Sequence, residues 1–288
     1  MPAFAPPYED DLELLRATAV AAGIIAAGYF RRDIKSWTKS NASPVSEADI
    51  VVDRYLAASL LNARPAYGWL SEETADNPSR LDCDRVFVVD PIDGTRAFLR
   101  GEDCWTVCIA VVEKGVPVAG VVYAPARNEM YEASIGGGAR LNGEPLVRHR
   151  RAGAAPSIPA PGAVHQELQQ AGLHYTRGQM YPSLAYRLVQ VATGKLDAAV
   201  ARRGSQDWDI AAAAVILSEC ELDFADVCSG FPQFNKRDVR HGALAALSDM
   251  SLKPHVHAAL IKVYGCPVDP LAEADTSSPQ LTGPLTDG

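Results

Sequence analysis

The fold of this chain is decided by the stretch Arg85-Val86-Phe87-Val88-Val89-Asp90-Pro91-Ile92-Asp93-Gly94-Thr95-Arg96-Ala97-Phe98. Its first part is apolar and β-branched, which predicts a buried strand over residues 86–89. Pro91 has no backbone N–H and a fixed φ, so we expect the strand to stop there. Gly94 permits a tight turn, after which the backbone N–H groups near Thr95 can open a short helix.

This stretch holds two carboxylates and a hydroxyl at the end of one strand, from Asp90, Asp93 and Thr95. Carboxylates this close repel each other unless a cation lies between them, and hard oxygen ligands suit Mg²⁺ or Mn²⁺. The neighbouring backbone N–H groups suit a phosphate. The alternative is an Asp-Gly turn in which Asp93 is an ordinary turn former, and it leaves Asp90 unexplained. The stretch therefore predicts a divalent metal site.

The composition allows one large domain or two small ones, because 288 residues, 48% of them hydrophobic and 22% charged, can bury a sizeable core. The net charge of −8 argues against a nucleic-acid polymer as a partner. An acidic protein that handles anionic phosphates needs a metal ion to invert the local charge. The bulk properties thus agree with the predicted metal site.

We predict a cytoplasmic location and no membrane partner. The cysteines show no Cys-x-x-Cys pair and no zinc-ligand spacing, which favours reduced thiols. They are Cys83, Cys104, Cys108, Cys220, Cys228 and Cys266. No secretory signal is evident. The apolar run over residues 17–30 is too short to span a bilayer, so we expect a core helix there.

Periodicity predicts alternating helices and strands along the chain. Helices are expected over 8–31, 47–62, 183–192 and 209–219, and strands around 36–41, 67–70, 86–89, 104–113, 116–123, 129–133 and 196–201. An Ala-, Pro- and Gly-rich segment, 150–163, is the most plausible internal boundary. It separates an α+β half with most of the predicted metal ligands (1–150) from an α/β half (151–266), which a polar tail (267–288) follows.

Four further acidic residues have both a structural and a functional interpretation. Asp49 stands three residues after Ser46, the spacing of a helix capping box, but a first-turn side chain can also face a neighbouring site. Glu72 and Glu73 follow a short apolar strand, and alternation along a strand lets at most one of them reach a shared site. A solvated acidic loop is the alternative for both. Asp209 opens an Ala-rich helix, where a cap or the helix dipole also favours Asp.

Four signatures taken together resemble the inositol monophosphatase superfamily of Mg²⁺-dependent, lithium-sensitive phosphatases. They are Pro44-Val45-Ser46-Glu47-Ala48-Asp49, Ser71-Glu72-Glu73, Asp90-Pro91-Ile92-Asp93-Gly94-Thr95 and Trp208-Asp209-Ile210-Ala211-Ala212. Their order and spacing match the family over roughly residues 10–250. The resemblance implies an α/β (α+β) fold, a layered α-β-α-β-α sandwich of the inositol monophosphatase and fructose-1,6-bisphosphatase type, commonly assembled as a homodimer.

The resemblance also implies a set of metal ligands. Glu72, Asp90 and the carbonyl of Ile92 would hold one ion, and Asp90, Asp93 and Asp209 a second. Two or three Mg²⁺ ions are expected, with Mn²⁺ as a substitute. Bound there, metal ions would acidify a water, neutralise the phosphate and stabilise the leaving oxygen, with in-line displacement and no phosphoenzyme.

Catalytic and substrate contacts follow from the same resemblance. Asp49 and Thr95 would orient and activate the attacking water, and Glu72 completes the catalytic set. The expected substrate contacts are Asp93, Gly94, Thr95 and Asp209, with the backbone N–H groups of the Gly-Thr pair holding the phosphate.

The residues within three of the motifs favour one branch of the superfamily, and with it one substrate. Residues 43–49 and 69–73 and the triplet Phe234-Asn235-Lys236 look like the 3′(2′),5′-bisphosphate nucleotidases, which convert adenosine 3′,5′-bisphosphate to AMP. Lys236, Arg237 and Arg240 could meet a second phosphate, or could be solvated surface charges. Inositol 1-phosphate or another small sugar or alcohol phosphate, such as histidinol phosphate, is the alternative. A weakly catalytic, partner-binding relative is a remote one.

Three departures from the family pattern stand out. Ser71 replaces a common Gly, and Arg96-Ala97-Phe98 replaces Thr-Asn-Phe, which places a cation near the substrate. Glu221-Leu222 replaces a Gly-Gly pair, so we expect an altered exit from the helix before it.

Overall fold

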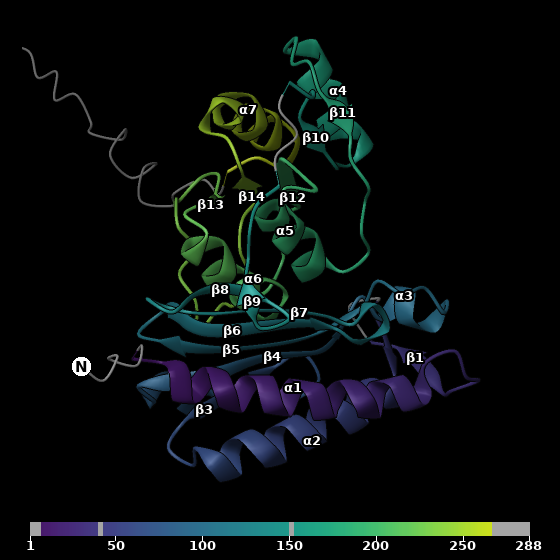
Figure 1. Ribbon diagram of the computed structural model, residues 1–288, viewed down its shortest axis with the longest axis vertical. Helices are drawn as coiled ribbons and strands as arrows, with labels where there is room; N and C mark the ends of the chain where they lie inside the picture. Colours follow the sequence, from purple (N-terminus) through teal and green to yellow (C-terminus); the bar gives the residue numbers. More distant parts are fainter. Residues whose placement is uncertain (1–6, 40–42, 150–152, 267–288) are drawn as a thin grey trace, which may run out of the picture.

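Helices and sheets alternate in five layers in the computed structural model, which describes residues 7–39, 43–149 and 153–266 (Figure 1). Helices α1 (Glu9–Tyr29) and α2 (Glu47–Ala63) form one outer layer, and α4 (Gly162–Gln170) and α7 (Lys253–Tyr264) the other. A large sheet, the pair α5 (Leu184–Thr193) and α6 (Asp207–Glu219), and a small sheet lie between them. The predicted sandwich is confirmed, while the predicted tail (267–288) lies outside the described residues.

The large sheet has seven strands in sequence order. They are β3 (Gly68–Ser71), β4 (Arg85–Asp93), β5 (Thr106–Glu113), β6 (Val116–Ala124), β7 (Glu129–Ser134), β8 (Gly138–Leu141) and β9 (Glu144–Pro145). Strands β3 and β4 run parallel, and every other neighbouring pair is antiparallel. Parallel strands end at the same edge of a sheet, so the residues after β3 and those at the end of β4 are brought together.

Strand β4 does not stop at Pro91, as the sequence predicts, but continues to Asp93. Asp90 pairs with Cys108 and Asp93 with Thr106, and the register shifts between these two pairs. One extra residue therefore bulges out of β4, and Pro91 lies in this bulge, where its missing N–H removes no ladder hydrogen bond. The bulge also lets the N–H of Ile92 donate to the Asp90 carboxylate at 3.0 Å.

Helix α1 is the one described helix long and apolar enough to cross a membrane by length and composition. One face of it is fully buried in the cluster between the outer helices and the large sheet. That face consists of Leu12, Leu15, Ala19, Ala22 and Ala26. Helix α1 is therefore a core helix, as predicted from its sequence.

The small sheet has the order β12 (Ala198–Ala201), β14 (Leu244–Leu247), β13 (Asp223–Asp226), all antiparallel. Two short two-stranded sheets complete the strands, β1 (Ser36–Thr38) with β2 (Pro44–Ser46) and β10 (Ser157–Ile158) with β11 (Thr176–Arg177). Helix α5 begins after its N-cap Ser183 and ends at Gly194, whose φ is 79°. The predicted 183–192 helix and the glycine stop are thus confirmed.

The expectation that all six cysteines are reduced is wrong. Cys228 and Cys266 form a disulfide across a sequence separation of 38, with their Cα atoms 5.7 Å apart. The pair joins the loop after β13 to the end of α7. Sequence spacing does not reveal this contact, because it arises only when α7 packs back beside the small sheet.

The exit of α6 places Glu221 in an unusual backbone conformation. Glu221 adopts φ 55°, the left-handed conformation that Gly takes most easily. The N–H of Leu222 donates to the carbonyl of Leu217 at 3.0 Å, which closes the last turn. An L residue at this position carries a conformational cost.

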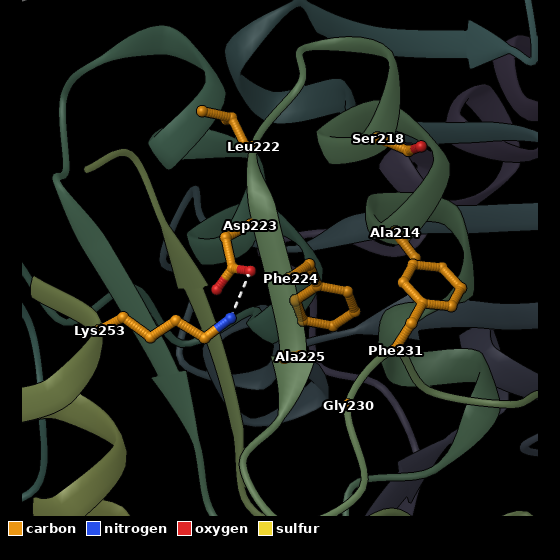
Figure 2. Close-up of a pocket in the computed structure, with 9 residues that line it drawn as sticks. All are labelled: Ala214, Ser218, Leu222, Asp223, Phe224, Ala225, Gly230, Phe231 and Lys253. Atoms are coloured by element: carbon orange, nitrogen blue, oxygen red, sulfur yellow. Dashed lines mark hydrogen bonds and ion pairs between the residues drawn. The ribbon is translucent and has the colours of Figure 1, made fainter. Parts of the chain in front are cut away.

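Two cavities lie away from the predicted acids. One, of about 310 Å³, is lined by α6, β13 and Phe231, with Lys253 paired to Asp223 at its side (Figure 2). The other, of about 850 Å³, lies where β9 meets the end of α5. Their described linings contain none of the predicted catalytic or metal-binding residues. The predicted acids lie elsewhere, at the edge where β3 and β4 end.

Candidate active site

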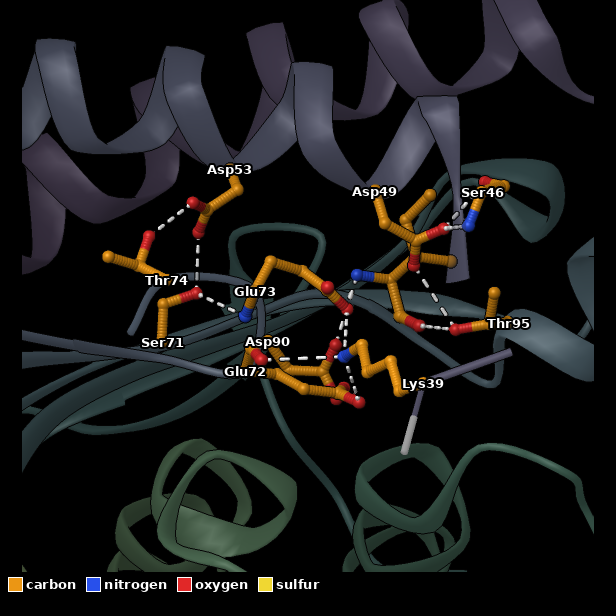
Figure 3. Close-up of polar contacts among 11 residues, drawn as sticks. Lys39, Ser46, Asp49, Asp53, Ser71, Glu72, Glu73, Thr74, Asp90 and Thr95 are labelled. Atoms are coloured by element: carbon orange, nitrogen blue, oxygen red, sulfur yellow. Dashed lines mark hydrogen bonds and ion pairs between the residues drawn. The ribbon is translucent and has the colours of Figure 1, made fainter. Parts of the chain in front are cut away.

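The edge where β3 and β4 end gathers acids from three distant segments (Figure 3). Asp90 lies in β4 and is 2% exposed. Glu72 follows β3, and its N–H donates to the carbonyl of Val89 at 3.2 Å. Asp49 reaches the same place from the first turn of α2.

Asp49 forms the predicted cap of α2 and also reaches Thr95. Its Oδ2 accepts hydrogen bonds from the Ser46 N–H at 2.8 Å and from the Ser46 hydroxyl at 2.5 Å, which caps α2. Its Oδ1 faces the Thr95 hydroxyl at 3.1 Å. Burial raises the pKa of Asp49 to about 6, although the hydrogen bonds from Ser46 and Thr95 oppose the rise.

Thr95 lies between two oxygen acceptors. Its hydroxyl is 3.1 Å from Asp49 Oδ1 and 3.1 Å from the carbonyl oxygen of Ile92. A hydroxyl has one proton, so it donates to only one of them at a time. Gly94, with φ 94°, makes the turn that precedes it, and the helix α3 (Thr95–Leu99) follows. The predicted glycine turn and short helix are confirmed.

Asp93 joins the large sheet to α5. Its Oδ2 accepts from the Ser183 hydroxyl at 2.6 Å and from the Ala185 N–H at 2.8 Å, both at the start of that helix. Burial raises the pKa of Asp93, and these hydrogen bonds oppose the rise. The predicted ligand is therefore held in one orientation by the second half of the chain.

The remaining acids influence one another through their charges. Burial raises the pKa of Asp90 well above its ordinary value, and the charges of Glu72, Asp93 and Asp209 raise it further. Burial and the Asp93 charge raise the pKa of Asp209 to about 8, although it accepts a hydrogen bond from the Gln206 N–H at 2.6 Å. The acids from β3, β4 and α6 thus share one electrostatic environment.

Glu72 and Glu73 both contact one lysine, while the expectation that at most one of them reaches a shared metal site stays a prediction. The Lys39 ammonium lies 3.0 Å from Glu72 Oε1 and 2.6 Å from Glu73 Oε1. Both acids lie beyond the end of β3 at Ser71, where strand alternation no longer separates them. Burial raises the pKa of Glu73 to about 7, although Lys39 opposes the rise. No sequence signal pointed to Lys39.

Asp53 is a second residue that the sequence analysis missed. Its carboxylate accepts from the Ser71 hydroxyl at 2.5 Å and the Thr74 hydroxyl at 2.6 Å, so it brackets the Glu72-Glu73 turn. The serine that replaces a common glycine thus has a positioning role here. Asp53 stands four residues after Asp49 on the same face of α2, and this spacing was the available signal.

A buried polar chain fixes the start of α6. Asp207 is fully buried and contacts His241 Nε2 at 2.7 Å, and it accepts from the Asn235 N–H at 2.7 Å. Arg80, 1% exposed, donates to the Asn235 side chain at 2.5 Å. Asp209, two residues into the same helix, is thereby tied to the connection between β3 and β4.

The cations proposed for a second phosphate are all exposed: Lys236, Arg237 and Arg240. Arg240 pairs with Asp238 at 2.9 Å, and its backbone bridges Gln206 just before α6. This arrangement fits solvated surface charges, and it also leaves these cations beside the helix that carries Asp209.

The chemistry of the donor set fits Mg²⁺, because the acids are hard oxygen donors whose pKa values are raised by burial and by the charges of neighbouring carboxylates. Within residues 7–39, 43–149 and 153–266, however, no three His, Cys, Asp or Glu side chains are arranged to hold a metal ion. The ammonium of Lys39 lies against Glu72 instead. The predicted ligand sets, with the Ile92 carbonyl, therefore remain predictions.

Comparisons with known proteins agree on one family. A sequence model of the inositol monophosphatase family matches residues 8–263. The histidinol-phosphatase of Chlorobaculum parvum is 32% identical over 230 residues, which are 74% of this chain and 86% of the relative. The inositol-1-monophosphatase of Mesorhizobium japonicum is 33% identical over 196 residues, which cover 65% and 73%.

Two further matches carry the SuhB name. The Nus factor SuhB of Haemophilus influenzae is 31% identical over 228 residues, covering 73% of this chain and 84% of the relative. The crystal structure of the extragenic suppressor protein suhB from Bartonella henselae superposes with a TM-score of 0.75 at 26% identity. That match covers 88% of this chain and 99% of the other.

Proposed function

This chain belongs to the inositol monophosphatase family, and we propose that it is a Mg²⁺-dependent phosphomonoesterase of a small alcohol phosphate. The observation that carries the proposal is the Thr95–Asp49 hydrogen bond at the sheet edge where Glu72 and Asp90 also lie. A hydroxyl and a carboxylate at this position can orient a water and accept its proton.

The roles within the chain follow from its own contacts. When Thr95 donates to Asp49, its oxygen lone pairs are left to accept a hydrogen bond from the attacking water. Asp49, with a pKa of about 6, is mostly ionised at pH 7 and can accept a proton. The first turn of α3, after Gly94, presents backbone N–H groups suited to phosphate oxygens.

Metal binding completes the proposal. Glu72, Asp90 and the Ile92 carbonyl, and Asp90, Asp93 and Asp209, are the proposed ligand sets for Mg²⁺. A bound metal supplies charge neutralisation at the phosphate and an acidified water. The hydrogen bonds from Ser183 and Ala185 hold Asp93 in place for this task.

Among substrates, histidinol phosphate and inositol 1-phosphate come first, because relatives with those activities in their names cover most of this chain at 32–33% identity. Adenosine 3′,5′-bisphosphate, which the motifs favour, comes third, since the two relatives that cover most of this chain are named for the other substrates. The domain boundaries, the homodimer, the cytoplasmic location and the lithium sensitivity remain predictions.

A partner-binding role is the second candidate function, because the relative from Haemophilus influenzae is named a Nus factor. Phosphate release from histidinol phosphate, inositol 1-phosphate and adenosine 3′,5′-bisphosphate separates the candidates. We expect metal-dependent turnover of at least one of the first two. Preference for the bisphosphate would restore the nucleotidase assignment, and no turnover on any of the three would favour the partner-binding role.

A further inference from the structure

Lys39 is a cation placed by the backbone at the acidic edge of the large sheet. It directly follows β1, and its N–H donates to the Ser43 carbonyl at 2.8 Å, which closes the β1–β2 hairpin. Strand β2 leads straight into α2, which carries Asp49. Lys39 and Asp49 are thus held by the same short segment.

The ammonium of Lys39 is bound on several sides by the Glu72-Glu73 turn (Figure 3). It lies 3.0 Å from the Glu72 carboxylate, 2.6 Å from the Glu73 carboxylate and 3.4 Å from the Glu72 carbonyl oxygen. The Lys39 side chain is 21% exposed, that of Glu72 17% and that of Glu73 3%. Most of this arrangement is shielded from solvent, unlike an ordinary surface ion pair.

The two carboxylates are not equivalent. Glu73 has the shorter contact and is almost fully buried, whereas Glu72 is more open and faces the edge that carries Asp90. Glu72 is also the one proposed as a metal ligand. An ammonium and a divalent cation bound to the same carboxylate repel each other, so each weakens the binding of the other.

We propose that Lys39 is a tethered competitor of the metal: its ammonium occupies Glu72 until a divalent cation displaces it, while Glu73 retains the displaced ammonium beside the site. This inference rests on the proposed metal-dependent function. It assigns Glu73 a positioning role, since it acts through Lys39 and not on the substrate. It also explains why two adjacent acids face one lysine, although only one of them is needed as a metal ligand.

Metal binding to the full chain, freed of metal by a chelator, tests the proposal by calorimetric titration with Mn²⁺ or Mg²⁺. Lys39→Met should lower the dissociation constant about two- to fivefold, the range expected when a partly exposed ion pair no longer competes. The matched control is Lys35→Met. It removes the same charge from an exposed position at the base of the same hairpin, and it should leave the dissociation constant unchanged.

A double-mutant cycle separates Glu73 from the ligand set. Glu73→Gln leaves Lys39 with Glu72 alone, so it should weaken metal binding in the otherwise native chain and much less in the Lys39→Met background. Equal weakening in both backgrounds would make Glu73 a direct ligand and overturn its assigned role.

The outcomes distinguish this inference from the proposed function. If the native chain binds metal and Lys39→Met binds it no more tightly, Lys39 is not a competitor, and the phosphatase proposal is unaffected. If the native chain and both lysine variants bind no metal, the competition and the metal-dependent function are both wrong. Circular dichroism of each variant verifies that it is folded.

Discussion

The Thr95 hydroxyl lies 3.1 Å from the Asp49 carboxylate, although 46 positions separate the two residues in the chain. One stands at the start of α3 and the other in the first turn of α2. Their contact depends on the bulge at the end of β4 and on the cap of α2. It is the relationship on which the proposed chemistry rests.

Replacing Thr95 by Val keeps its shape and removes its hydroxyl. We expect kcat to fall by about 10²–10⁴, because the hydroxyl that orients the attacking water and links it to Asp49 is lost, with no loss of metal affinity. Phosphate release and metal titration measure the two effects. Thr95→Ser is the control, since it keeps the hydroxyl and should keep most of the activity. Native kcat in Thr95→Val would remove this residue from the mechanism.

Asp93→Asn tests the second proposed metal site. Its side-chain oxygen can still accept the hydrogen bonds from Ser183 and Ala185, so the fold should persist while activity falls about a hundredfold or more. Thermal melting and phosphate release measure both properties. The exposed Asp238→Asn loses the same charge and should remain active. Full activity in Asp93→Asn would contradict the two-metal assignment.

The helix exit at Glu221 offers a stability test that is independent of function. Glu221 has φ 55°, so Glu221→Gly should raise the free energy of unfolding by about 1 kcal/mol. Leu222 does not have a positive φ and packs against the core, so Leu222→Gly should lower the free energy of unfolding by about 1–2 kcal/mol. Denaturant unfolding compares the pair. If both substitutions changed the free energy of unfolding in the same direction, the backbone conformation would not decide the effect.

The raised pKa of Asp209 predicts a pH dependence of stability in chelator. Below pH 4 both the folded and the unfolded state hold this proton. As the pH rises toward the folded-state pKa of about 8, the unfolded state loses the proton first, so stability must fall. Thermal melting between pH 4 and 8 should show a smaller fall for Asp209→Asn than for the native chain. An equal fall in stability in both proteins would mean that the raised pKa of Asp209 does not cause the pH dependence.

Much of the site was predictable, because apolar runs that end in acids mark strand ends. Val86 to Val89 predicted the strand that carries Asp90, and Ser46 with Asp49 predicted the cap of α2. The predictions that failed concern features that are set by tertiary pairing. The bulge that accommodates Pro91 is set by the register with β5, which local sequence does not encode.

Other features also required the folded chain. Lys39 meets Glu72 and Glu73 only because the β1–β2 hairpin lies beside the end of β3. The Cys228–Cys266 disulfide forms only because α7 ends next to the loop after β13. Single residues without periodicity or motif spacing gave no local signal for either contact.

The most direct test of the proposed function is the rate of inorganic phosphate release from histidinol phosphate and inositol 1-phosphate. It is measured with Mg²⁺, after a chelator is added, and after Mg²⁺ is restored in excess. The proposed function predicts turnover of at least one of the two esters. This turnover should stop when the chelator is added and return when Mg²⁺ is restored. Turnover that the chelator leaves unchanged, or no turnover of either ester at any Mg²⁺ concentration, would contradict it.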